Sequence, residues 1–195
     1  MNTTISHSKD TIRDTRGYIV DTARGLFSEF TYLGVSMDDI AKKLNIAKAS
    51  IYYHYTGKVE IYEKVLDEVF NDLSLVITEA SKEKMIDRKI YLLIKNYLDF
   101  GFSEKNLIKA TVLKLSPADA RITKHIAKLR NQATDLIRPI IEDFLNSKKL
   151  DKKVDSRLLT SMLTSMMDGL LLEYSFLDKK IDSAKISNQI IAILF

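Results

Sequence analysis

The sequence of 195 residues contains no cysteine. Without thiols the chain can form neither disulfides nor thiolate zinc or iron–sulfur sites, and it has no cysteine nucleophile. The absence also fits the reducing conditions of the cytosol. Disulfide scaffolds, thiol redox chemistry and cysteine-based catalysis are therefore excluded.

Residues that interrupt helices are scarce, with two prolines and six glycines, while 46% of the residues are hydrophobic and 29% are charged. This mixture is typical of a globular, helix-rich protein rather than a disordered chain.

The sequence also lacks long apolar runs. The N-terminal segment MNTTISHSKD lacks the apolar stretch of a signal peptide, and the uncharged run 158–167 is shorter than the roughly 20 residues that cross a bilayer. We expect a soluble, cytoplasmic protein that does not associate with membranes.

The net charge of the whole chain is only weakly positive, at +4. Residues 1–58 carry eight Lys and Arg against six Asp and Glu. A mild basic excess helps a protein approach a polyanion but does not identify one. Any case for nucleic-acid binding must therefore rest on the placement of the charges.

The apolar pattern predicts helices throughout the chain. A first amphipathic helix is expected at 11–30, where Ile19, Ala23, Leu26, Phe27 and Phe30 recur at helical spacing. No strand pattern is visible, so we predict an all-α fold. Pro139 is expected to kink or split the helix that contains it. Two short helices should follow the first one, and then a long helix at 58–81. Further helices are expected at 88–102, 104–115, 118–148, 155–177 and 182–194.

The segment SMDDIAKKLN at 36–45 has the signals of a short helix with defined ends. Ser36 followed three residues later by Asp39 resembles a capping box, and Asp38 and Asp39 complement the positive end of the helix dipole. Asn45 stands where the chain must turn, and asparagine often replaces glycine in the left-handed conformation after a helix. A second short helix then follows in 47–57.

Two short helices joined by a tight turn and packed on a first helix form a helix-turn-helix, whose second helix enters the DNA major groove. At about 100° per residue, Tyr55 lies within about 40° of Ile51, whereas Ala49, Tyr52 and Tyr53 lie about 100° or more away. Ile51 and Tyr55 are therefore predicted to face the core. Ala49, Ser50, Tyr52 and Tyr53 are predicted to face outward.

The outward residues suit contacts with DNA. We expect Lys48 to donate to guanine O6 and N7, with Ala49, Ser50 and Tyr53 offering apolar or hydroxyl contacts to the bases. The hydroxyls of tyrosines and the ring of His54 can donate to phosphate oxygens, which position a protein without reading sequence. Ser36 and Lys58 are expected to contact phosphate as well.

Residues 16–61 resemble the N-terminal domain of the TetR family of transcriptional regulators. The resemblance implies that the chain binds a palindromic operator as a homodimer, with Arg16 among the DNA contacts. One departure is Thr31, where the family usually has glycine four residues after the first-helix Phe. The residues that match the family pattern are Arg16, Leu26, Phe27, Ser36, Asp38, Asp39, Ile40, Ala41, Asn45, Lys48, Ala49, Ser50, Ile51, Tyr52, His54, Tyr55 and Lys58.

The family resemblance also implies a dimer interface built from the last two helices, here within 155–195. Ser161, Ser165 and Gly169 form a line of small residues at helical spacing, which lets another helix approach closely, although packing inside the subunit would explain the line equally well. Asp168 and Gly169 are similar to a recurring feature of the family's penultimate helix. The predicted interface residues are Ser161, Ser165, Gly169, Leu172 and Ile190.

The resemblance further implies a small-molecule inducer bound by the C-terminal part of the chain. Large and adaptable apolar side chains are available to line such a pocket, although a stripe of this kind is more often simply core. The expected pocket residues are Tyr91, Tyr97, Phe100, Leu113, Met162, Met166 and Tyr174.

We therefore predict a helix-turn-helix DNA-binding domain at 1–57 and a helical ligand-binding and dimerisation domain at 58–195. The expected function is a repressor that a small molecule releases from its operator. An activator or an all-helical protein-interaction module are the alternatives. An enzyme is not expected because no catalytic motif is found, and neither a metal nor a cofactor is expected.

Overall fold

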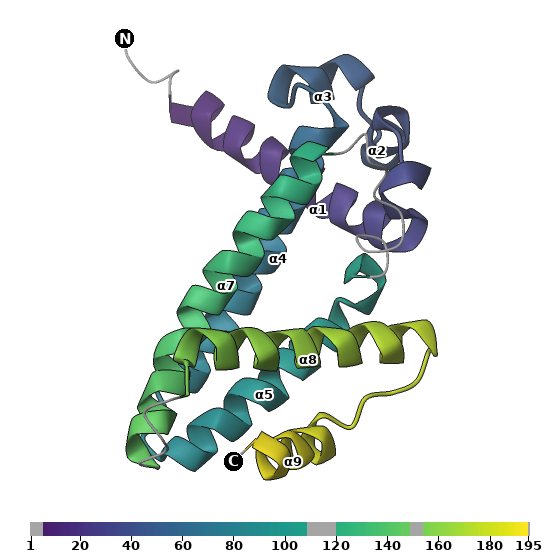
Figure 1. The fold of residues 1–195 in the computed structure, drawn as a ribbon. Coiled ribbons are helices and arrows are strands. Elements are labelled where there is room, and N and C mark those ends of the chain that lie inside the picture. Colours follow the sequence, from purple (N-terminus) through teal and green to yellow (C-terminus); the bar gives the residue numbers. More distant parts are fainter. Residues whose placement is uncertain (1–5, 109–119, 149–153, 195) are drawn as a thin grey trace. The chain divides into compact units, whose positions relative to one another are not determined.

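The computed structural model describes residues 6–108, 120–148 and 154–194, and every described element of regular structure is a helix. The N-terminal helices are α1 (Ser6–Gly34), α2 (Met37–Leu44), α3 (Lys48–His54) and α4 (Lys58–Ser81). They are followed by α5 (Ile86–Ser103), α7 (Ala120–Ser147), α8 (Ser156–Phe176) and α9 (Ser183–Leu194) (Figure 1). The predicted all-α fold is confirmed. The predicted helix at 104–115 lies mostly outside the described residues.

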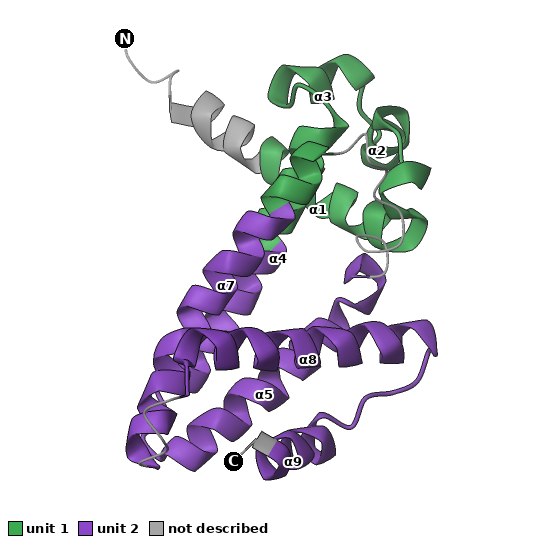
Figure 2. Ribbon diagram, in the orientation of Figure 1, with its two compact units in different colours: residues 1–68, 110–125 green, residues 69–109, 126–195 purple. Residues whose placement is uncertain are grey.

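The chain divides into two compact units, which Figure 2 distinguishes by colour. Unit 1 comprises residues 1–68 and 110–125, and unit 2 comprises residues 69–109 and 126–195. The division falls inside α4 and α7, whereas the sequence had suggested a boundary after Gly57. Apolar side chains at the start of α4, such as Ile61 and Val65, are fully buried, so the first turns of this helix serve the core of unit 1.

The core of unit 1 gathers one apolar face from each of its helices. Ile19 and Phe27 of α1, Ile40 of α2, Ile51 of α3 and Tyr62 of α4 are all fully buried. The Phe27 and Tyr62 rings meet edge to face with centroids 4.8 Å apart, which is a favourable arrangement for aromatic pairs. This core fixes α2 and α3 on α1 and α4.

Helix α1 is interrupted near its end at Thr31, which has φ 65° and ψ 168°. This region of backbone space is essentially reserved for glycine, because a Cβ atom crowds the backbone there. The interruption explains why the helical pattern of the sequence ends near Phe30. The chain then resumes a helical turn up to Gly34 before it enters α2.

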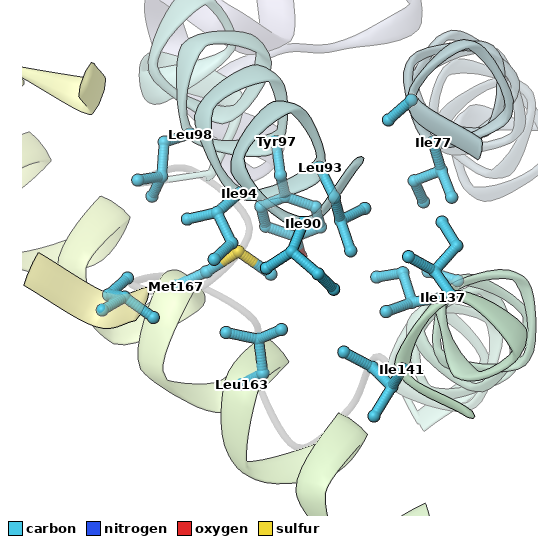
Figure 3. Close-up of a cluster of buried hydrophobic side chains, with 14 of the residues drawn as sticks. Ile77, Ile90, Leu93, Ile94, Tyr97, Leu98, Ile137, Ile141, Leu163 and Met167 are labelled. Atoms are coloured by element: carbon cyan, nitrogen blue, oxygen red, sulfur yellow. The ribbon is translucent and has the colours of Figure 1, made fainter. Parts of the chain in front are cut away.

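Unit 2 is built around α5, which contacts both α8 and α9. Figure 3 shows Ile90 and Ile94 of α5 directed toward Leu163 and Met167 of α8, with Ile137 and Ile141 of α7 beside them. Gly101 lets α8 come close, since a Cβ atom there would lie 2.2 Å from Cδ1 of Leu171.

Pro139 does not split α7, which continues from Ala120 to Ser147. Of the two expected outcomes, a kink or a split, the split was wrong. The neighbouring residues Ile137, Ile140 and Ile141 are buried on one side, whereas Pro139 itself is exposed. The packing of the apolar face therefore outweighs the loss of one backbone hydrogen bond at the solvent side.

Candidate nucleic-acid interface

The N-terminus of α2 is fixed by the predicted capping box. The Asp39 N–H donates to the Ser36 hydroxyl over 3.2 Å, and the Ser36 N–H donates to the Asp39 carboxylate over 2.8 Å. The Ser36 hydroxyl also donates to the same carboxylate, and these bonds from Ser36 lower the pKa of Asp39 below its ordinary value. Reciprocal bonds of this kind satisfy donors that a helix start leaves unpaired.

The turn between α2 and α3 depends on Asn45, which adopts the left-handed conformation with φ 55° and ψ 43°. Its N–H donates to the Lys42 carbonyl and that of Ile46 donates to the Ala41 carbonyl, each over 3.1 Å. The prediction for Asn45 is confirmed. These bonds close the end of α2 and set the direction in which α3 begins.

Helix α3 has one buried and one exposed face. Ile51 is 0% exposed, whereas Tyr52 and Tyr53 are 49% and 76% exposed. Ala49 and Ser50 are exposed as well. The predicted orientation of the helix is confirmed. Large aromatic side chains exposed on one face of a helix are available for contact with a partner.

Tyr55 ends α3 and is buried, as expected. Its hydroxyl donates to the Arg16 carbonyl oxygen over 3.1 Å, and the Arg16 guanidinium lies 4.9 Å from the centre of the Tyr55 ring. Arg16 also lies 3.9 Å from the Glu60 carboxylate. Arg16 thus helps hold α3 against α1 and α4, and its predicted contact with DNA stays a prediction.

Lys48 begins α3 and forms an ion pair with Asp38 in the first turn of α2. Its Nζ lies 2.7 Å from Oδ2 of Asp38, and both side chains are about half exposed. The hydrogen bond to Asp38 raises the pKa of Lys48 above its ordinary value. This pair was not predicted, because the two residues are ten positions apart across a turn.

Lys58 and His54, two further predicted DNA contacts, both interact with other side chains or backbone of unit 1. The ammonium of Lys58 donates to the Tyr32 carbonyl over 3.0 Å and lies 4.2 Å from the centre of its ring. This tether joins the start of α4 to the segment after Thr31, so Lys58 has a structural role that was not predicted. His54 is partly buried, and its ring meets that of Tyr53 edge to face at 5.1 Å.

The residues predicted to line a pocket lie in different environments of unit 2. Tyr97 is buried and donates its hydroxyl to Oδ1 of Asp168 over 2.7 Å, while Arg130 binds the other oxygen over 2.6 Å. Burial, reinforced by the charge of Asp168, raises the pKa of Tyr97 well above its ordinary value. Tyr91, Phe100, Met166 and Tyr174 are partly buried, and Leu113 lies outside the described residues.

Met162 does not fit a pocket, because it is 52% exposed on the outer face of α8. The predicted interface residues on α8 lie at its surface: Ser161, Ser165 and Gly169 are exposed, and Leu172 is partly buried.

Ile190 was also predicted to lie in the interface. It is only 3% exposed and belongs to the core of unit 2, so its assignment to an interface was wrong. Leu158 and Phe176 are also exposed on α8. Their spacing with Met162 could have revealed them, because the three positions repeat at intervals of whole helical turns.

No described helix is both long enough and apolar enough to cross a membrane. Within the described residues, no group of three or more His, Asp or Glu side chains is placed to hold a metal ion.

Comparison with known proteins identifies the family. Residues 19–65 match the model of the bacterial regulatory proteins of the tetR family, and residues 62–195 match the C-terminal region of YsiA-like proteins within the TetR group. The chain belongs to the TetR family. It is a DNA-binding transcriptional regulator and not an enzyme, as the sequence predicted.

Two relatives of this TetR-family chain are regulators of the biofilm operon icaADBC. The negative regulator IcaR of Staphylococcus epidermidis is 55% identical over 53 residues, which are 27% of this chain and 29% of that protein. IcaR of Staphylococcus aureus is 30% identical over 142 residues, covering 66% of this chain and 75% of that protein.

Solved structures of transcriptional regulators share the fold. FadR of Bacillus subtilis, crystallised with stearoyl-CoA, has a TM-score of 0.78 at 21% identity and covers 91% of this chain and 96% of its own. FadR of Bacillus halodurans has the same TM-score at 17% identity, with 90% and 91% covered. At sequence identities of 17% and 21%, the similarity shows a shared fold.

Proposed function

We propose that this regulator is a homodimeric repressor that binds a palindromic operator through α3 and leaves it when unit 2 binds a small molecule. The observation that carries the proposal is the exposed face of α3, with Ala49, Ser50, Tyr52 and Tyr53 opposite the buried Ile51. A helix held in this way by a helix-turn-helix fits the major groove. Two such helices in a dimer read half-sites about 34 Å apart or at a similar spacing.

The outer face of α8 supports the dimer. Leu158, Met162 and Phe176 are exposed there, next to the small residues Ser165 and Gly169. Exposed apolar side chains at helical spacing, together with small residues, allow two helices to approach closely. Ser161 and Leu172 extend this face, whereas Ile190 is left out of it.

The ligand is proposed to be an apolar small molecule, with long-chain acyl-CoA as its first candidate class. The match of residues 62–195 to the family's C-terminal region and the shared fold with a regulator crystallised with stearoyl-CoA support this choice. The interior of unit 2 consists mostly of Ile and Leu side chains, an apolar environment that suits an acyl chain. A chain of this function is expected to work in the cytoplasm, where its DNA lies.

DNA binding is tested by selecting duplexes from a randomised pool with the purified protein. A two-fold symmetric sequence should be enriched, and its binding should weaken steeply with salt because several phosphates are contacted. Tyr53→Ala should weaken binding, whereas Leu75→Ala, which truncates an exposed side chain of unit 2, should not. Enrichment of no sequence would contradict the proposal and favour a protein-interaction module.

Ligand control is tested with stearoyl-CoA as the probe, and with free CoA and stearate as controls. By linkage, a ligand that releases the operator must bind the DNA-free protein more tightly, with a coupling of about 1–3 kcal/mol. Operator affinity should therefore fall about 5- to 150-fold at saturating ligand. A reporter gene downstream of the selected sequence distinguishes repression from activation, because only a repressor lowers its transcription.

A further inference from the structure

The ion pair between Asp38 and Lys48 lies on the surface that faces DNA in the proposed function. Asp38 belongs to the first turn of α2 and Lys48 is the first residue of α3. Their charged atoms are 2.7 Å apart. The pair therefore joins the two helices of the helix-turn-helix at the ends that approach the duplex.

Helix capping does not account for Asp38. The bonds that close the start of α2 are made by Ser36 and by the carboxylate of Asp39. The carboxylate of Asp38 instead accepts from the ammonium of Lys48. A carboxylate in the first turn complements the helix dipole, but on a surface that meets phosphates it is electrostatically unfavourable. The ion pair with Lys48 gives Asp38 a second role there.

The number of donors on Lys48 suggests what that role is. An ammonium has three N–H donors, and one of them is occupied by Asp38. Two remain, which equals the number of acceptors, O6 and N7, on the major-groove edge of guanine. The flanking Ala49 and Ser50 are small and exposed, so they leave room for this base edge.

The carboxylate also changes which part of DNA attracts Lys48. A free lysine binds any phosphate and adds affinity without sequence preference. A neighbouring negative charge cancels much of that attraction but leaves the directed hydrogen bonds to a base. The pair thus reduces non-specific binding more than specific binding.

We propose that Asp38 is a positioning residue for base recognition, which orients Lys48 toward guanine and suppresses its binding to phosphate. The inference rests on the proposed function, because it requires α3 to lie in the major groove. Asp38 acts through Lys48 and does not itself need to touch the DNA.

The test is selection from the randomised duplex pool with wild type, Asp38→Asn, Lys48→Ala and the double variant, followed by titrations at several salt concentrations. Lys48→Ala should abolish the preference for one guanine in each half-site. Asp38→Asn should lower that preference by about two- to five-fold per half-site, the range set by an exposed ion pair. It should also tighten binding to a scrambled duplex and steepen the salt dependence by about one phosphate contact per subunit.

The controls separate positioning from a structural effect. Asp38→Glu keeps the charge and should restore most of the guanine preference. Asp21→Asn removes an exposed carboxylate of α1 and should leave the preference and the scrambled-duplex affinity unchanged. In the Lys48→Ala background, Asp38→Asn should have no further effect on base preference.

Two results would overturn the inference while leaving the proposed function intact. One is an unchanged guanine preference in Asp38→Asn, and the other is an equal loss of preference with and without Lys48. If the wild-type protein enriched no sequence at all, the proposed function would fail and the inference with it.

Discussion

The bonds that close the ends of α2 in unit 1 and the bonds inside unit 2 join residues at very different distances along the chain. In unit 1 the start and end of α2 are closed by bonds between residues no more than five positions apart, such as Ser36 with Asp39 and Ala41 with Ile46. In unit 2 Tyr97 binds Asp168 and Ser183 binds Asp99, which are 71 and 84 positions apart. The ends of α2 are therefore specified locally, whereas the interior of unit 2 depends on distant segments meeting correctly. The attachment of α3 and α4 in unit 1 also depends on distant residues, through the bonds of Tyr55 to Arg16 and of Lys58 to Tyr32. The variants that follow probe this difference.

The largest effect is expected in unit 1 for Ile51→Ala, which removes a fully buried side chain. The loss of transfer free energy and the cavity should lower the free energy of unfolding by about 2–5 kcal/mol. Urea unfolding gives the total change, and amide hydrogen exchange locates it. Exchange should accelerate in α2 and α3 and stay unchanged around Leu163 of unit 2. Equal acceleration in both units would show that they do not differ in this way.

Gly101→Ala tests the close packing of unit 2. The new methyl group would lie 2.2 Å from Leu171, so we expect a loss of about 1–3 kcal/mol from overpacking, measured by thermal unfolding. Gly25→Ala in α1 is the control, because its added methyl group meets nothing within 4 Å. The control should gain about 0.5–1 kcal/mol of helix stability. A loss of the same size in both variants would show that the cost at Gly101 does not come from overpacking.

Tyr97→Phe removes the bond from Tyr97 to Asp168 and should cost about 1.5 kcal/mol, since hydrogen bonds to charged groups are worth about 1.5–3 kcal/mol. The pKa of Tyr97 is raised by burial, so its contribution is complete below the unfolded-state pKa of about 10 and declines as the pH rises above it. Denaturant titrations at increasing pH should show this decline in the wild type and a smaller one in the variant. Tyr91→Phe on the same helix is the control, and a similar cost there would refute the role of the bond.

The smallest effect is a gain, expected for Thr31→Gly in unit 1. The strain at φ 65° and ψ 168° costs about 1–3 kcal/mol for a residue with a Cβ atom. Glycine relieves that strain but loses about 0.5–1 kcal/mol to its greater freedom when unfolded, so the net gain should be about 1 kcal/mol. Asn45→Gly is the control. Asn45 is also left-handed, but asparagine adopts this conformation with little strain, so the variant should change the melting temperature little. A destabilised Thr31→Gly variant would mean that contacts of the threonine side chain outweigh the strain.

Much of unit 1 could be predicted from the sequence because its signals are local. Ser36 with Asp39 and the turn at Asn45 act over a few residues, and the spacing of Ile51 from Tyr52 and Tyr53 sets the two faces of α3. The pair of Lys48 with Asp38 and the tether of Lys58 to Tyr32 could not be predicted, because each joins residues that only the fold brings together.

The helices, the family and the exposed face of α3 could be read from the amino-acid sequence, since periodicity, caps and turn residues depend on neighbours along the chain. Packing in three dimensions was needed to show that Ile190 belongs to the core, that Met162 faces outward and that α7 continues through Pro139. Each of these outcomes depends on which apolar faces meet. Whether a side chain is buried depends on contacts between helices, so it cannot be predicted from the sequence of one helix.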